Sequence, residues 1–170
     1  MNTSAALIGS LGSVVAAWHR IRNNKEPIAS NQDSTYAENF LLMLGAENIT
    51  PLMTRIMDAS LVLHGEHTIN ASTFTAMVTS STLANASQVV ASAIGSLSGP
   101  LHGGANEKVV SMLSKIDSKD DIRPWLDDTL KAKNVVWGMG HREYSVKDPR
   151  ANILTEMVQE LFNEREGGVT

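Results

Sequence analysis

The stretch GPLHGGANE, at positions 99–107, is the part of the sequence from which the rest of the chain is best interpreted. Proline fixes one backbone torsion, and the two glycines after His102 permit a close backbone approach or a positive φ. Residues 105–115 then have a helical pattern. His102 is therefore expected at or just before a helix N-terminus, where unpaired N–H groups and the helix dipole disfavour an added positive charge. A neutral imidazole held there can donate a hydrogen bond to a carbonyl oxygen and to the enol formed from it, whereas the simpler alternative is a turn with a buried histidine.

Composition restricts the class of protein. A chain of 170 residues can bury one substantial core, in one or two compact domains. The formal net charge is −4 and no basic stripe is present, which argues against nucleic acid as a partner. There is no cysteine, so disulfides and thiolate chemistry are excluded. The apolar N-terminus lacks a basic region and is interrupted by polar residues from His19, too early for a membrane span, so we expect a soluble cytoplasmic protein.

Apolar spacing and helix-end signals predict an all-α chain. Apolar residues recur at alternating spacings of four and three between Leu7 and Ile21, which predicts an amphipathic helix over about 4–23. Further helices are expected over 35–44, with Ser34 as its cap and Gly45 at its end, and over 51–62, 70–83, 86–97, 105–115, 124–133 and 149–165.

Two segments carry more specific expectations. The helix over 86–97 is nearly uncharged and apolar on all sides, so we expect it to be buried within the domain or between subunits. The short apolar run 135–137 indicates a strand-like segment leading into the glycine loop that follows it.

Four further segments match one enzyme family in their order and approximate spacing. They are YAENFLLML at 36–44, HTINAST at 67–73, GMGHREY at 138–144 and KDPRA at 147–151. Together with GPLHGGANE they closely resemble the citrate synthase family, from the first helix to nearly the last residue. The resemblance implies a multi-helical, all-α citrate synthase-like fold, in which the chain is a central part of a longer protein. Residues 1–99 would form part of the large helical domain and residues 100–170 most of the small, mobile domain.

The resemblance also implies an activity. Citrate synthases condense acetyl-coenzyme A with oxaloacetate and hydrolyse the citryl thioester to citrate and coenzyme A. This chemistry needs a base for the acetyl methyl proton, a donor for the resulting enol and an acid for the keto oxygen under attack. By resemblance His102 stabilises the enol and His141 polarises the oxaloacetate keto group. Acetyl-coenzyme A is then a co-substrate, and no permanently bound cofactor is expected.

Two further residues resemble ligands of oxaloacetate. His67 would contact the substrate, and Arg150 would be one of its arginine ligands. Arginine suits a bidentate grip on a carboxylate better than lysine. From the residues alone, a surface ion pair with Asp148 is the preferred interpretation of Arg150.

Other matching positions have supporting or cofactor-binding roles in the family. Ser72 resembles a serine that hydrogen-bonds the enol-stabilising histidine and fixes its tautomer, and Asn70 matches a supporting position. The coenzyme A adenine would be bound through the backbone of Val136, Trp137, Gly138, Met139 and Gly140.

A metal site is one further interpretation of the histidines. His64, Glu66 and His67 are close enough in sequence to share a helix face. A third suitable ligand is not evident, however, and the family uses no metal. No metal is therefore predicted.

Some features separate this chain from the family pattern. The acid that usually follows the first motif histidine is Thr68 here. The family's catalytic base is an aspartate well downstream of KDPRA, so we expect little or no synthase activity from these 170 residues alone. The alternatives are 2-methylcitrate synthase, which takes propionyl-coenzyme A, and a non-catalytic helical module that binds a partner. The helix over 86–97 favours a homodimer formed through large-domain helices.

Overall fold

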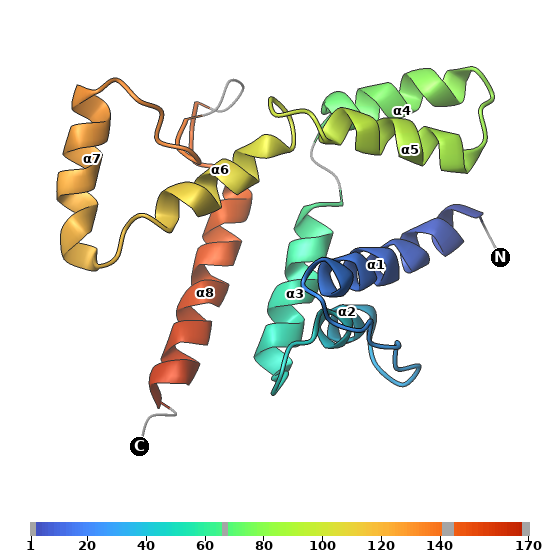
Figure 1. Ribbon diagram of the computed structural model, residues 1–170, viewed down its shortest axis with the longest axis horizontal. Coiled ribbons are helices and arrows are strands. Elements are labelled where there is room, and N and C mark those ends of the chain that lie inside the picture. Colours follow the sequence, from blue (N-terminus) through green and yellow to red (C-terminus); the bar gives the residue numbers. More distant parts are fainter. Residues whose placement is uncertain (1–2, 66–67, 141–144, 168–170) are drawn as a thin grey trace. The chain divides into compact units, whose positions relative to one another are not determined.

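The computed structural model describes residues 3–65, 68–140 and 145–167 (Figure 1). Within these ranges the chain forms helices and no strand, which confirms the predicted all-α class. The run 135–137 is an irregular segment and a turn, so the prediction of a strand-like segment there is wrong. The helices are α1 (Thr3–Arg22), α2 (Tyr36–Leu44), α3 (Pro51–Leu63), α4 (Ala71–Ser81), α5 (Ala86–Leu97), α6 (Gly104–Leu113), η1 (Lys119–Asp121, a 3₁₀-helix), α7 (Ile122–Lys131) and α8 (Pro149–Gly167).

Side-chain caps fix where several helices begin. Thr50 caps α3, as its position before Pro51 predicts, and Asn70 caps α4, which decides between Asn70 and Ser72 as the predicted start of that helix. Each cap accepts the backbone N–H of the residue three positions later. Asn85 opens α5 with a capping box. The cap of α2 is Thr35 and not the predicted Ser34, because the Thr35 hydroxyl accepts a backbone N–H of the first turn. Each such cap stabilises its helix by about 1 kcal/mol.

Contacts divide the chain into two compact units. The first comprises Met1–Thr68 and Lys147–Thr170, and the second comprises Ile69–Val146. The boundary predicted at Gly99–Pro100 falls inside the second unit, between α5 and α6. These units group residues by contacts within this chain only, so the assignment of 1–99 and 100–170 to a large and a small domain stays a prediction.

In the first unit, α2 packs against both α1 and α3, and α3 also contacts α8. The Tyr36 hydroxyl of α2 donates to the Ile8 carbonyl of α1 at 3.2 Å. A side chain at Gly12 would lie 2.7 Å from the Tyr36 oxygen, so glycine at this position permits the close approach of α1 and α2. An ion pair between Arg55 and Glu160 joins α3 to α8.

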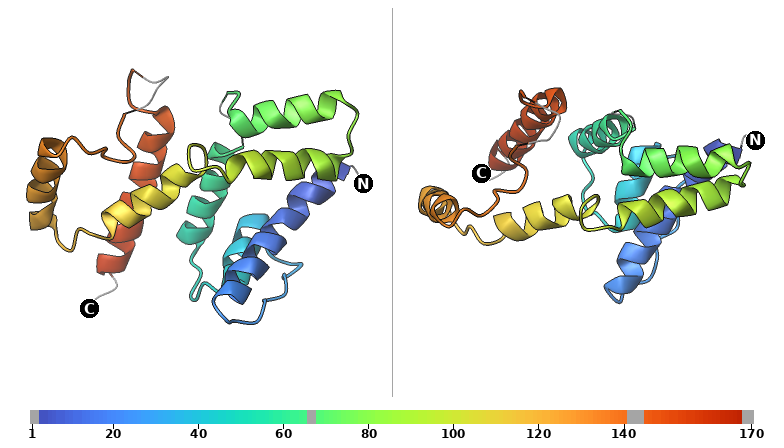
Figure 2. Two further views of the ribbon diagram at one scale, coloured as in Figure 1. Left: turned by 45° about the horizontal axis from the view of Figure 1, so that its top comes forward. Right: turned by 90° about the horizontal axis from the view of Figure 1, so that it is seen from above.

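The second unit begins with a helical hairpin, α4 and α5, which lie side by side (Figure 2). Hydroxyl groups of Thr79 and Ser92 meet across it at 2.9 Å. No residue of α5 is buried, and Ile94 is 52% exposed. The described residues therefore do not bury α5, because α4 covers one side of it, and its predicted burial between subunits stays a prediction.

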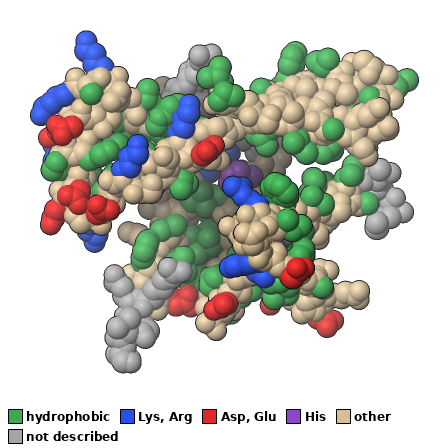
Figure 3. Space-filling model, viewed as in Figure 1, with side chains coloured by type: hydrophobic (Ala, Val, Ile, Leu, Met, Phe, Trp, Pro, Cys, Tyr) green, Lys and Arg blue, Asp and Glu red, His purple; other side chains and the backbone are tan. Residues whose placement is uncertain are grey.

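Apolar side chains are widely exposed in the part of the chain that the structure describes, for example along the α4–α5 hairpin (Figure 3). The accessible surface is 13100 Å². Two separate compact domains that together weigh 18.3 kDa would expose roughly 10,000 Å². The excess, on the order of 3,000 Å², is the size of an obligate protein interface. No helix within the described ranges has both the length and the apolar character needed to cross a membrane.

Two glycines give opposite predictions for stability. Gly45 ends α2 at φ 90°, and a side chain there would also meet the Arg20 guanidinium. We expect Gly45→Ala to lower the free energy of unfolding by about 1–2 kcal/mol, measured by urea titration followed by circular dichroism.

Gly9 lies within α1, and a Cβ added there would have no neighbour within 4 Å outside its own helix backbone. Gly9→Ala should instead stabilise by about 0.5–1 kcal/mol, and shifts in the same direction for both variants would contradict this interpretation.

Candidate active site

His102 lies in the turn that joins α5 to α6, two residues before α6 begins, as the sequence predicts. Its backbone N–H donates to the Gly99 carbonyl at 3.0 Å, and the Gly103 N–H donates to the Leu97 carbonyl at 3.0 Å. A Cβ at position 103 would overlap that Leu97 oxygen, so the turn requires glycine there. The His102 side chain is half-buried and not enclosed, which leaves part of the ring accessible.

The first turn of α4 holds the His102 ring. Ser72 Oγ lies 2.8 Å from Nε2 of His102, which is the contact that the family resemblance implies. Ser72 Oγ is also 3.0 Å from the carbonyl oxygen of Ala93 on α5, to which it is able to donate. A serine hydroxyl has one proton, so these two acceptors compete for it. Asn70 caps the same helix two residues earlier and so fixes the position from which Ser72 projects.

The segment 134–140 turns back against α6. Gly138 and Gly140 adopt φ values of 86° and 77°, in the left-handed region that favours glycine. The Met139 N–H donates to the Val136 carbonyl at 3.2 Å, which closes the turn between them. The Lys108 ammonium group lies 4.2 Å from the centroid of the Trp137 ring, in cation–π geometry.

A cavity of about 560 Å³ lies between α6, α7 and residues 134–137. Lys108 from α6 and Lys115 from the turn after it line the cavity, together with Trp125 from α7 and Trp137. Its volume falls within the range of small-molecule sites. Both positive charge and aromatic surface are therefore available beside the turn that holds residues 136–140.

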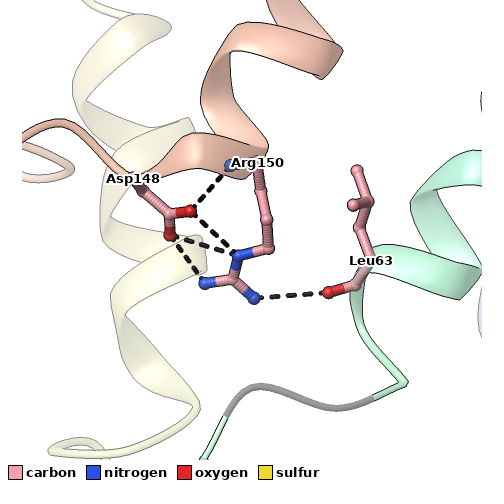
Figure 4. A network of polar contacts seen from close by, with 3 residues as sticks. All are labelled: Leu63, Asp148 and Arg150. Carbon is pink, nitrogen blue, oxygen red and sulfur yellow. Dashed lines mark hydrogen bonds and ion pairs between the residues drawn. The ribbon is translucent and has the colours of Figure 1, made fainter.

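Arg150, in the first turn of α8, is held by its neighbour Asp148 (Figure 4). Arg150 Nε lies 3.1 and 3.2 Å from the two carboxylate oxygens, and Nη2 lies 2.7 Å from Oδ2. The Arg150 backbone N–H donates to the same carboxylate at 2.9 Å. Hydrogen bonding to Asp148 raises the pKa of the Arg150 guanidinium above its usual value, so the group is charged at every physiological pH. The ion pair preferred from the residues alone is therefore present.

The ion pair does not occupy the whole guanidinium. Asp148 approaches along the edge formed by Nε and Nη2, and Nη1 donates to the Leu63 carbonyl at 3.3 Å. A guanidinium has five N–H groups, and these contacts among the described residues use three. One N–H on each terminal nitrogen is left, which is the arrangement that grips a second carboxylate. Asp148 and Leu63 thus orient Arg150 without consuming its binding capacity.

The remaining predicted residues are distributed as follows. His67 and His141 lie outside the described residues. Arg150 belongs to the first unit, whereas Ser72, His102 and residues 136–140 belong to the second. The structure brings Ser72 to His102. The convergence of His102 with His67, His141 and Arg150 around one substrate stays a prediction.

The metal site considered from the sequence can be examined in part. The Nδ1 atom of His64 lies 2.6 Å from the Ser60 carbonyl, so this nitrogen is engaged by α3 itself. Among the residues whose placement is described, no group of three or more His, Cys, Asp or Glu side chains is arranged to hold a metal ion.

Two features of the site were not predicted from the sequence. One is the contact of Lys108 with Trp137, and the other is the second anchor of Arg150 on the Leu63 carbonyl. The first had no motif as a signal, because Lys108 and Trp137 lie far apart in the sequence. The second had none, because a backbone carbonyl at the end of a helix leaves no mark in the sequence.

Comparison with known proteins places these features in a family. A family model described as "Citrate synthase, C-terminal domain" matches residues 1–169. Citrate synthase of Synechocystis sp. is 49% identical over 156 residues, which cover 92% of this chain and 39% of that protein. A 2-methylcitrate synthase of Shewanella oneidensis is 38% identical over 91% of this chain and 42% of its own length. The chain thus spans about 40% of the length of the curated relatives it matches.

A solved structure agrees with this similarity. It is the ternary complex of citrate synthase from Thermoplasma acidophilum with carboxymethyl coenzyme A and oxaloacetate. Its TM-score to this chain is 0.80 at 28% identity, over 95% of this chain and 42% of that one.

Asp148→Asn tests how Arg150 is held. The neutral amide removes the ionic part of the contact, which at a partly exposed site stabilises by about 1 kcal/mol. We therefore expect solvent exchange of the Arg150 Nε–H to accelerate about fivefold, measured by ¹H–¹⁵N NMR. Asp127→Asn is the control, because Asp127 pairs with Nε of the more exposed Arg123. An Arg150 exchange rate that Asp148→Asn leaves unchanged would show that Asp148 does not orient the group.

Proposed function

The chain belongs to the citrate synthase family, and from this premise we propose that it supplies part of an active site that condenses acetyl-coenzyme A with oxaloacetate. In this reaction the acetyl methyl carbon forms a bond to the keto carbon of oxaloacetate, and water then cleaves the thioester to give citrate and coenzyme A. The observation that carries the proposal is the 2.8 Å contact between Ser72 Oγ and His102 Nε2.

His102 would be the donor to the enol. When Ser72 donates its proton to Nε2, a neutral His102 ring carries its own proton on Nδ1. That N–H is then available to the thioester oxygen of acetyl-coenzyme A and, more strongly, to the enol oxygen formed after loss of the methyl proton. A fixed donor of this kind typically contributes about a hundredfold or more to the rate. The N-terminus of α6 begins two residues later and favours the negative charge that develops.

Oxaloacetate would be bound by its carboxylates. The two remaining N–H groups of Arg150 match the two oxygens of one carboxylate, and the contacts with Asp148 and Leu63 orient them beforehand. His67 would contact the same substrate and His141 would polarise its keto oxygen, and both roles rest on the family resemblance. The Thermoplasma acidophilum complex supports this choice of ligands, since that citrate synthase was solved with oxaloacetate and a coenzyme A derivative together.

Acetyl-coenzyme A would be the co-substrate, with no permanently bound cofactor. The backbone of residues 136–140 is the proposed contact for its adenine. Two left-handed glycines in this segment permit a close backbone approach, as such a contact requires.

Two alternatives are kept. Propionyl-coenzyme A would replace acetyl-coenzyme A if the protein is a 2-methylcitrate synthase, and the similarity to the Shewanella oneidensis enzyme favours that alternative over other acyl groups. A non-catalytic binding module would retain the helices without a preference for oxaloacetate. A cytoplasmic location stays a prediction from the sequence.

Direct binding is the appropriate test, because it reports on the oxaloacetate site without depending on a general base. We expect isothermal titration to show oxaloacetate binding to the 170-residue chain. Arg150→Lys keeps the charge but loses the paired donors, so it should weaken this binding by about tenfold or more.

Arg123→Lys is the matched control, because Arg123 is an exposed arginine of α7. It should bind oxaloacetate as the parent chain does. Absence of oxaloacetate binding at millimolar concentration, or equal affinities for Arg150→Lys and the parent, would contradict the proposal.

A homodimer is proposed from the exposed apolar surface. Ile94 on α5 is 52% exposed, and a second copy packed against this helix would cover it. We expect light scattering to give a dimer mass for the parent chain and a shift toward monomer for Ile94→Glu. Val110→Glu, at a position of α6 that is 67% exposed, should leave the mass unchanged. A parent chain that stays monomeric at high concentration would contradict the dimer.

A further inference from the structure

Two adjacent residues of α6 contact two adjacent residues of the segment 134–140. Lys108 lies over the Trp137 ring, with its ammonium nitrogen 4.2 Å from the centroid. Val109 approaches the next residue, Gly138, so closely that a side chain there would lie 3.4 Å from Val109 Cγ2. The segment is thus fastened to the middle of α6 at consecutive positions.

Much of the segment is exposed. Val135 is 61% exposed and Met139 is 74% exposed, whereas Val136 and Trp137 are half-buried. One side of Trp137 lines the cavity of about 560 Å³. The two glycines that follow have no side chains to restrict their torsions. The contact with Lys108 is therefore a large part of what fixes the Trp137 ring and the turn attached to it.

We propose that Lys108 is a positioning residue: through the Trp137 ring it holds the backbone of residues 136–140 against α6, in the conformation that receives coenzyme A. The identity of the ligand rests on the function proposed above. Lys108 would act on the ligand through Trp137 and the turn, without touching the reacting atoms.

The position of Lys108 along α6 links its contact with Trp137 to the turn that holds His102. Lys108 is four residues after the first residue of α6, Gly104, which corresponds to about 6 Å along the helix axis, and His102 lies in the turn just before. One short helix then carries both the turn with the enol-binding imidazole and the anchor of the adenine-binding backbone. This helix would then fix the distance between the sites for the two ends of a coenzyme A thioester.

The first experiment needs no ligand. We expect Lys108→Gln to accelerate hydrogen exchange at the amides of residues 137–140 by about two- to fivefold, the range that corresponds to a cation–π contact at a partly exposed site. Lys108→Arg should restore the parent rates, because a guanidinium also binds an aromatic face. Lys115→Gln is the matched control, since it removes the same charge from the same cavity. Parent rates in Lys108→Gln, or equal acceleration in Lys115→Gln, would overturn the proposal.

A double-mutant cycle separates the cation–π contact from simple packing. Trp137→Tyr keeps an electron-rich ring and Trp137→Leu removes it. In the parent background, exchange at Gly138 and Met139 should be slower with tyrosine than with leucine. In the Lys108→Gln background, this difference should disappear. A tyrosine–leucine difference of the same size in both backgrounds would show that the ring acts by packing alone, and would overturn the role of Lys108.

The last experiment titrates coenzyme A into the same variants. Lys108→Gln should weaken coenzyme A binding by about two- to fivefold, with recovery in Lys108→Arg and no change in oxaloacetate affinity. Equal coenzyme A affinity in parent and Lys108→Gln would overturn the link to the ligand. A parent chain that binds no coenzyme A would contradict the proposed function, while the exchange rates would still decide whether Lys108 positions the turn.

Discussion

One hydroxyl proton determines what His102 is able to do. Ser72 Oγ lies between Nε2 of His102 and the carbonyl of Ala93, at 2.8 and 3.0 Å. Donation to the ring leaves a donor at Nδ1, whereas donation to Ala93 makes a neutral ring an acceptor there. Only the first arrangement stabilises an enol. The capped start of α4, the α5 carbonyl and the glycine turn before α6 all serve to place these three groups.

The proposed oxaloacetate site follows the same principle of oriented donors. Arg150 is held on one edge by Asp148 and at Nη1 by a carbonyl, so its remaining N–H groups are aimed before a ligand arrives. Arg150 belongs to one compact unit and His102 to the other. An active site built from both would depend on how the units are held together.

Sequence reasoning was most successful where structure is local. Thr50-Pro51 and Gly45 act within one helical turn, so their roles as helix ends were predicted correctly, and Asn70 was one of the two starts expected for α4. The choice between the neighbouring hydroxyls of Ser34 and Thr35 was wrong, because both offer the same acceptor chemistry and only the backbone geometry separates them. The described residues do not bury α5, since an apolar composition predicts burial without specifying what covers a helix.

Long-range contacts required other information. Ser72 and His102 are 30 residues apart, and only the resemblance to a known family connected them. Lys108 and Trp137 are separated by a similar length of chain, and no motif connected them. Asp148 and Arg150 are close neighbours, so their pairing was foreseen from the sequence, but its compatibility with substrate binding became apparent only from which edge of the guanidinium is used.

The tautomer of His102 is the most direct test of the proposed chemistry. Long-range ¹H–¹⁵N NMR of the histidine-labelled chain distinguishes a protonated ring nitrogen from one with a free lone pair. We expect a proton on Nδ1 and a lone pair on Nε2 near neutral pH, with this preference lost in Ser72→Ala. A proton on Nε2 and a lone pair on Nδ1 would show that Ser72 donates to Ala93, and would contradict the role of His102 as the enol donor.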